Sequence, residues 1–476
     1  MQIYSETGDF RLYQGSMLDM LQVIAPNSID AVLTDPPYEL GFMGKGWDNS
    51  GIAFQPDTWR KCYSVLKSGG YLLAFGGTRT FHRIACAIED AGFEIRDTIM
   101  WLYGSGFPKS MNIGLAIDKK NGVESEIVGY TSQQDIRSGN YTGVCTNNNE
   151  YSRVDWPIKK ASNEWAGWGT ALKPAYEPVI VARKPCEGSC VDNVMRYGVG
   201  GLNIDGCRVG DDLIKGGTMP DFRDVGRQQK EISGVDKLSF GQITNAERKP
   251  LADHVGRYPS NVILTYDDTD FDEVCGGMPE TKSTQAQGIH RNNRNGNTVF
   301  SNTSCGFNNS RYDSRKLEGF DDEGSAARYF YCAKASKRDR DEGLDAFQEK
   351  QTTDGSLRCN ADTARMFGAN STLHRNTHPT VKPVDLMQYL VRLVTPKGGT
   401  VLDPFNGSGS TGKAVMYENR DRNSGYKYIG IELTAEYLPI ADARIRYAAG
   451  DHSPVEPAEQ PLTGQVTFFD LLGGAE

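Results

Sequence analysis

The sequence lacks several patterns that would assign it to common protein classes. Its ten cysteines include no CxxC pair and its six histidines no HExxH, so nothing completes a zinc pattern. No apolar run approaches the ~20 residues that a membrane helix needs. Residues 1–10 contain acids and no apolar core, which excludes a signal peptide. Scattered thiols in a long chain indicate free cysteines, and we expect a cytoplasmic protein.

The chain also lacks an excess of positive charge. Its formal net charge is −9 over 476 residues, so any contact with nucleic acid must come from a local basic patch. At this length the chain is too long for one ordinary domain and can bury a large core.

The most informative short stretch is Asp35-Pro36-Pro37-Tyr38, which follows the apolar residues 29–33. That run predicts a buried strand, and two prolines stop a strand. The stretch therefore places a carboxylate, a carbonyl and an aromatic face at a strand's carboxyl end, where open α/β sheets bind ligands. A planar base with an exocyclic amine fits these groups: Asp35 and the Pro36 carbonyl accept its hydrogens and Tyr38 stacks on its ring. The alternative is a simple proline-punctuated turn.

Strand and helix patterns alternate on both sides of a long irregular region. Apolar periodicity predicts a helix over 57–67, ended by Gly69-Gly70, and a strand over 71–75, and the pattern continues through a return strand at 179–182. It resumes over 373–450. This order predicts an α/β fold with a mostly parallel sheet. We expect domain ranges of 1–184 (with an excursion at 104–170), 185–372, 373–450 and a flexible acidic tail at 451–476.

A second informative stretch follows the predicted strand 400–402. Residues 403–412 are rich in glycine, a helix is expected from Lys413, and Glu432 follows the next strand. Strand, glycine-rich turn, helix, strand and acid is the layout of a nucleoside-binding unit, in which the acid accepts ribose hydroxyls. A rival is the phosphate-binding P-loop GxxxxGK, but its next residue should be Ser or Thr and is Ala414.

Three motifs together resemble one enzyme family. They are Asp-Pro-Pro-Tyr at 35–38, His-Pro-Thr-x-Lys-Pro at 378–383 and Asp-Pro-Phe-x-Gly-Ser-Gly at 403–409. In this order they resemble the β class of amino-group DNA methyltransferases, which transfer a methyl group from S-adenosylmethionine to adenine N6 or cytosine N4. The resemblance implies a Rossmann-like methyltransferase sheet with helices on both faces, and a large irregular target-recognition region inserted at 185–372. It also implies a bacterial or phage-encoded protein.

The resemblance also implies roles for individual residues. Asp35, Pro36, Pro37 and Tyr38 would be catalytic, without a metal. Glu432 would hold the ribose of the cofactor and Asp19 its adenine amine. Thr380 and Lys382 would lie at its methionine end, with Lys382 a suitable partner for the carboxylate. The remaining cofactor-pocket residues would be Asp403, Phe405, Asn406, Gly407, Gly409 and Thr411. In this family Asp before Pro-Pro is usual for adenine, so Asp35 favours adenine N6 over cytosine N4.

The expected partner is double-stranded DNA, whose target base must be flipped out to expose its amine. Residues 281–316 carry six Lys or Arg against one acid and are dense in Asn, a mixture that can neutralise phosphates and read bases. A solvated loop is the alternative. The expected DNA contacts are Arg291, Arg294, Arg311 and Arg315.

The tail offers one further hypothesis. Gln465-x-x-Phe468-Phe469 resembles peptides that dock on bacterial sliding clamps, although apolar tail residues also pack on their own domain. Rival functions are methylation of RNA or of a protein glutamine, P-loop nucleotide hydrolysis, and DNA binding without catalysis. The recognition sequence and the oligomeric state cannot be read from the chain.

Overall fold

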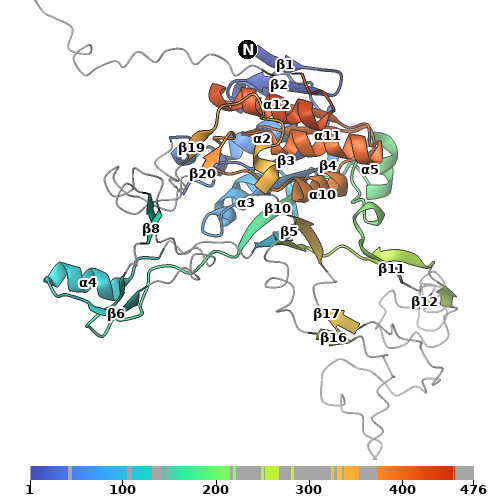
Figure 1. Ribbon diagram of the computed structural model, residues 1–476. Coiled ribbons are helices and arrows are strands. Elements are labelled where there is room, and N and C mark those ends of the chain that lie inside the picture. Colours follow the sequence, from blue (N-terminus) through green and yellow to red (C-terminus); the bar gives the residue numbers. More distant parts are fainter. Residues whose placement is uncertain are drawn as a thin grey trace, which may run out of the picture. The chain divides into compact units, whose positions relative to one another are not determined.

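The structure is a computed structural model, shown in Figure 1. It describes residues 2–40, 46–103, 110–130, 143–145, 151–153, 157–214, 218–220, 248–250, 252–266, 280–282, 323–325, 330–334, 337–352, 372–453 and 455.

Ten of the strands in these residues form one large sheet. In spatial order they are β1 (Gln2–Glu6), β2 (Phe10–Gln14), β22 (Lys427–Glu432), β21 (Thr400–Asp403), β3 (Ile29–Thr34), β4 (Leu66–Phe75), β10 (Tyr176–Arg183), β5 (Glu94–Tyr103), β15 (Val262–Tyr266) and β18 (Tyr331–Lys334). Strands β2, β22, β21, β3 and β4 run parallel to one another, whereas β1 is antiparallel to β2 and β10 is antiparallel to both β4 and β5. The mostly parallel α/β sheet predicted from the sequence is confirmed.

Helices cover both faces of this sheet, which is why the central strand β3 is buried along its whole length. The helices α1 (Met17–Met20), α2 (Pro56–Val65) and α3 (Phe81–Asp90) share one apolar cluster with Leu72 and Ala74 of β4. The intervening residues Leu73 and Phe75 are buried on the other face. That face is covered by α10 (Val384–Val394), α11 (Ser410–Arg422) and α12 (Leu438–Ala448), drawn in orange to red in Figure 1.

Two element boundaries differ from the prediction. Gly69-Gly70 does not end helix α2, which stops at Val65, but lies inside β4. The backbone of Gly69 is left-handed (φ +82°), and a Cβ there would lie 2.1 Å from the Asn193 side chain. Glycine is therefore required at this irregular point of β4. Helix α11 starts at Ser410 rather than at Lys413. The last residues of the glycine-rich stretch are therefore already helical, which fixes the direction of their side chains.

The remaining elements are short. The helices are α4 (Ile113–Asn121), α5 (Cys190–Tyr197) and α8 (Lys337–Asp341). The two-stranded pairs are β6 (Glu126–Tyr130) with β9 (Pro157–Lys160), β7 (Gly143–Cys145) with β8 (Tyr151–Arg153), β11 (Val209–Ile214) with β14 (His254–Arg257), β12 (Thr218–Pro220) with β13 (Arg248–Pro250), β16 (Glu280–Lys282) with β17 (Glu323–Ser325), and β19 (Lys350–Thr352) with β20 (Thr372–His374). No described helix has the length and apolar character needed to span a bilayer.

The chain divides into two compact units. Unit 1 comprises Met1–Asn203, Asn261–Asp270 and Cys332–Glu476, and unit 2 comprises Ile204–Ser260 and Phe271–Tyr331. Strands β15 and β18 of the large sheet come from within 185–372, the range that the sequence assigns to an inserted region. The inserted target-recognition region itself stays a prediction.

Candidate active site

The predicted site residues follow the carboxyl ends of adjacent parallel strands. Asp35 comes directly after β3, Asp403 ends β21 and Glu432 ends β22. Because the three strands are parallel neighbours, their ends meet at one edge of the sheet. The Thr34 hydroxyl donates to Asp403 Oδ1 over 2.6 Å, which joins the two motifs across 369 sequence positions. The structure thus brings both motifs into one site in unit 1.

Asp35 has one paired and one unpaired oxygen. Lys382 Nζ lies 2.7 Å from Asp35 Oδ2. Asp35 Oδ1 is buried and has no hydrogen-bond partner among the residues that the structure describes. An unpaired carboxylate oxygen in a buried position has a large desolvation cost, so such an atom marks a place where a ligand donor is expected.

Lys382 is buried among carboxylates and aromatic rings. Its ammonium also lies 3.2 Å from the Tyr38 hydroxyl and 3.4 Å from Glu177 Oε2, and 5.0 Å from the ring centre of Phe75. Burial alone would lower the pKa of Lys382, but the carboxylates of Asp35 and Glu177 outweigh it and raise that pKa above its usual value. Lys382 therefore stays charged.

Tyr38 is held by its hydroxyl. The hydroxyl donates to Glu177 Oε2 over 2.9 Å. Burial, together with the negative charges of Asp35 and Glu177, raises the pKa of Tyr38 well above its usual value. The phenol is therefore neutral at physiological pH.

Asp403 organises the glycine-rich turn. Its Oδ1 accepts from Thr34 Oγ1 and from the Phe405 backbone N–H at 3.1 Å, and its Oδ2 accepts from Thr411 Oγ1 at 2.6 Å. Burial raises the pKa of Asp403 to about 6, although these hydrogen bonds act in the opposite direction. The bond to Thr411 depends on the early start of α11, which turns this hydroxyl toward β21.

Glu432 is held by backbone N–H groups on both of its oxygens. Gly407 N–H donates to Oε2 and Thr434 N–H to Oε1, each over 2.7 Å. Burial raises the pKa of Glu432 to about 7 against the effect of these two bonds. A carboxylate offers about four acceptor positions, so Glu432 retains capacity for ribose hydroxyls.

Asn406 and Gly407 shape the turn between these two acids. Asn406 Oδ1 accepts from the Tyr428 hydroxyl over 2.7 Å, inside the core. The backbone of Gly407 is left-handed (φ +50°), and a Cβ on it would lie 2.9 Å from His378 Nε2. Burial lowers the pKa of His378 to about 4, so its ring is neutral at pH 7. Any side chain at position 407 would displace the His378 ring, so glycine is required there.

The other predicted cofactor residues occupy varied positions. Asp19 is exposed in α1, after β2, whose last residue Gln14 pairs with Glu432. Thr380 is exposed, and Phe405 is half-buried against the apolar cluster of α1–α3. The predicted DNA contacts Arg291, Arg294, Arg311 and Arg315, and the tail residues Gln465, Phe468 and Phe469, lie outside the described residues.

The P-loop alternative required Lys413 to reach a bound phosphate. Instead, Lys413 is fully buried within α11, where its Nζ lies 2.8 Å from Glu342 Oε2 and 3.3 Å from the Asp339 carbonyl. A lysine fixed against the segment around α8 does not serve as the phosphate-binding lysine of a P-loop.

Two residues that sequence reasoning missed are part of the site. Glu177 comes from β10, and Thr34 is the last residue of β3. The signal for Glu177 was a charged residue at the head of the otherwise apolar strand Val179–Ala182. Its meaning depends on which strands β10 pairs with, and that information is tertiary.

A family profile described as DNA methylase, N6_N4_Mtase, matches residues 29–199 and 244–443, well over half of the chain. The chain belongs to this family of DNA methylases. The resemblance that the three motifs predicted is confirmed, and S-adenosylmethionine is the methyl donor of the family. Membership and the burial of Lys413 together argue against the nucleotidase alternative.

Individual relatives match the chain in part. The type II methyltransferase M.HindIII of Haemophilus influenzae is 22% identical over 151 residues, which cover 31% of this chain and 37% of that protein. M.HpaI of Haemophilus parainfluenzae is 33% identical over 108 residues, covering 21% and 34%. The chain thus spans about a third of the length of these curated relatives. Among solved structures, the cytosine-N4-specific PvuII DNA methyltransferase has a TM-score of 0.39 at 12% identity, covering 95% of both chains.

Proposed function

We propose that this protein transfers the methyl group of S-adenosylmethionine to the exocyclic amine of a flipped base in double-stranded DNA, with adenine N6 as the acceptor. Cytosine N4 is the alternative, and Asp35 before Pro36-Pro37 favours adenine by the family's pattern. The observation that carries the proposal is the unpaired, buried Asp35 Oδ1, one strand away from the Asp403 turn.

The acceptor amine needs activation because its lone pair is delocalised into the ring. Asp35 Oδ1 and the Pro36 carbonyl are proposed to accept the two amine hydrogens and so localise the lone pair on nitrogen. Tyr38 stacks on the flipped base and returns about 1–3 kcal/mol of the lost base stacking.

When bound, the cofactor supplies a methyl group on a sulfonium. The nitrogen lone pair forms the N–C bond, the C–S bond electrons go to sulfur, and the nitrogen's surplus proton leaves through Asp35 to solvent. Neither a metal nor a covalent enzyme intermediate takes part, and the protein contributes mainly positioning.

The cofactor residues are proposed as predicted from the sequence. Glu432 accepts the ribose hydroxyls and Asp19 the adenine amine, and Thr380 lies at the methionine end. The proposed turn residues are Asp403, Phe405, Asn406, Gly407, Gly409 and Thr411. Two features support a fit: Glu432 has acceptor capacity left, and Gly407 has no side chain at the turn. The observed partners of Lys382 favour a role at Asp35 rather than at the methionine carboxylate.

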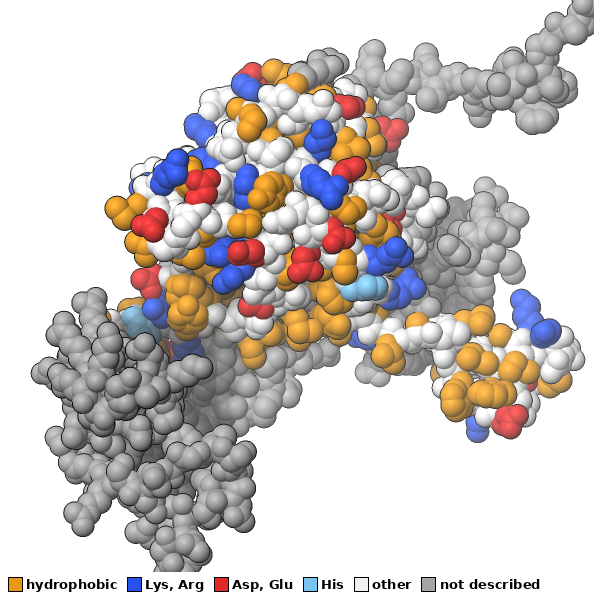
Figure 2. Space-filling view, turned by 180° about the vertical axis from the view of Figure 1, so that it is seen from behind, with side chains coloured by type: hydrophobic (Ala, Val, Ile, Leu, Met, Phe, Trp, Pro, Cys, Tyr) orange, Lys and Arg blue, Asp and Glu red, His pale blue; other side chains and the backbone are white. Residues whose placement is uncertain are grey.

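The DNA contacts are proposed to lie at Arg291, Arg294, Arg311 and Arg315. On the face shown in Figure 2, positive and negative side chains of the described residues are interspersed, so this face does not present a field of one sign. A sliding-clamp contact through the tail and a cytoplasmic location stay predictions.

The decisive experiment incubates the purified protein with isotopically labelled S-adenosylmethionine and double-stranded DNA, then identifies the methylated nucleoside by mass spectrometry. RNA and protein are parallel substrates. We expect label on N6-methyladenine. Asp35→Ala should abolish transfer and retain cofactor affinity, whereas the surface control Asp57→Ala should behave like wild type. Wild-type transfer rates in folded Asp35→Ala would contradict the proposal, as would folded protein without affinity for the cofactor.

A further inference from the structure

The head of strand β10 brings a second carboxylate to Asp35. Because β10 runs antiparallel to β4, its first residues lie beyond the carboxyl end of β4, with Val179 paired to Phe75. This is the edge that Asp35 occupies, because β4 is the parallel neighbour of β3. The side chain of Glu177 there is 22% exposed, close to the 20% of Asp35.

Glu177 shares its partners with Asp35. One oxygen, Oε2, accepts the Tyr38 hydroxyl and lies 3.4 Å from Lys382 Nζ, while the same ammonium lies 2.7 Å from Asp35. Burial and the charge of Glu177 together raise the pKa of the adjacent Tyr103 to about 12. By the two Lys382 distances, the site holds two carboxylates around one ammonium.

The second carboxylate changes how Lys382 acts on Asp35. If the Lys382 ammonium were paired with Asp35 alone, its charge would cancel the charge of the Asp35 carboxylate. Asp35 would then be a weaker acceptor of amine hydrogens. A second carboxylate on the same ammonium offsets this effect and leaves net negative charge in the pocket. That charge also complements a positively charged sulfonium and an amine that becomes positive as the N–C bond forms.

We propose that Glu177 is a positioning residue of the methyl-transfer site. Through Lys382 it keeps Asp35 a strong acceptor, and through the Tyr38 hydroxyl it fixes the ring on which the base stacks. This inference rests on the proposed function, and it assigns the first residues of β10 to the acceptor side of the pocket.

The test compares Glu177→Gln with wild type in single-turnover methyl transfer and in cofactor binding. Glutamine keeps the size and accepts the Tyr38 hydroxyl but removes the charge. We expect a roughly 10–100-fold slower transfer step, with cofactor affinity and melting temperature near wild type. Glu177→Asp keeps the charge and should recover part of the rate. The matched control is Glu94→Gln. Glu94 begins the neighbouring strand β5 and pairs with Arg183 at the other end of β10, so this variant should transfer normally.

A double-mutant cycle with Lys382→Met tests the route of the effect. Since Glu177 acts on Asp35 through this ammonium, Glu177→Gln should slow transfer much less in the Lys382→Met background than in wild type. Equal slowing in both backgrounds would contradict the charge-sharing role.

The outcomes separate the two proposals. An active wild type with an equally active, folded Glu177→Gln overturns this inference alone, as does a Glu177→Gln whose slower rate merely follows lost stability or lost cofactor binding. A wild type that binds the cofactor but methylates no DNA overturns the proposed function and this inference with it.

Discussion

Asp35 and Asp403 lie at the ends of neighbouring parallel strands, yet their surroundings differ. Both oxygens of Asp403 accept hydrogen bonds from uncharged groups of the same site. Asp35 instead has a lysine on one oxygen and no described partner on the other. The Asp403 carboxylate thus builds the turn, whereas the Asp35 carboxylate retains capacity for a ligand. Four measurements test this contrast, ordered by expected change in cofactor affinity.

The largest effect is expected from removing the turn-building carboxylate. Asp403→Ala leaves the buried hydroxyls of Thr34 and Thr411 without their acceptor, so the free energy of unfolding should fall by about 2–4 kcal/mol. Cofactor affinity should fall by a factor of roughly 100 or more, because the turn loses its anchor. Calorimetric titration and denaturant unfolding measure the two quantities. Asp35→Ala is the comparison, and its cofactor affinity should stay near wild type; an equal loss of cofactor affinity in both variants would remove the distinction.

A smaller effect is expected from a methyl group in the turn. Gly407→Ala puts a Cβ about 2.9 Å from the buried His378 ring, which must shift, and cofactor affinity should fall about tenfold. Gly398→Ala is the matched control, because Gly398 is also left-handed (φ +75°) but has nothing within 4 Å of its Cβ position. It should carry only the backbone cost of about 1 kcal/mol in stability. If both variants bind the cofactor alike, contact with His378 does not matter.

Cofactor affinity should also depend on pH through Glu432. Its pKa of about 7 means that the carboxyl is largely protonated at pH 6 and ionised at pH 8. The ionised form accepts ribose hydroxyls better, so the dissociation constant should rise about tenfold from pH 8 to pH 6. Asp403, with a pKa of about 6, adds a second step at lower pH. Calorimetry across this range measures the slope. Glu432→Gln should flatten the upper step; an unchanged profile in that variant would assign the titration elsewhere.

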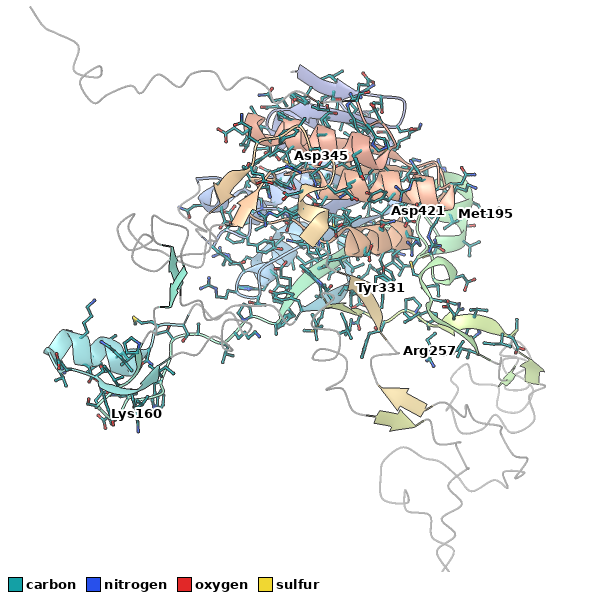
Figure 3. All side chains as sticks on the ribbon, viewed as in Figure 1. Lys160, Met195, Arg257, Tyr331, Asp345 and Asp421 are labelled. Atoms are coloured by element: carbon teal, nitrogen blue, oxygen red, sulfur yellow. The ribbon has the colours of Figure 1, made fainter. Side chains whose placement is uncertain are left out.

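The same contrast explains what the sequence could predict. Pro36-Pro37 and the glycine-rich turn are local signals, and parallel strand order alone then implies that their strands end at one edge. Glu177 was not predictable in the same way, because its place depends on β10 inserting antiparallel between β4 and β5. Burial likewise decided the role of Lys413, since a GxxxxGK string does not reveal which way its lysine points. Asp421, labelled in Figure 3, lies in the last turn of this same helix α11.

The smallest change in cofactor affinity is expected at Lys413. Its ammonium is buried and pairs with Glu342 instead of pointing into the glycine-rich turn. Lys413→Met breaks a buried pair with Glu342 and should lower the free energy of unfolding by about 2–4 kcal/mol. Cofactor affinity should stay within about twofold of wild type, because no phosphate depends on this lysine. Lys427→Met removes the half-exposed lysine paired with Asp9, and it should change stability by less than about 1 kcal/mol. Loss of nucleotide binding without loss of stability in Lys413→Met would restore the phosphate-binding role and contradict the assignment of the turn to a nucleoside.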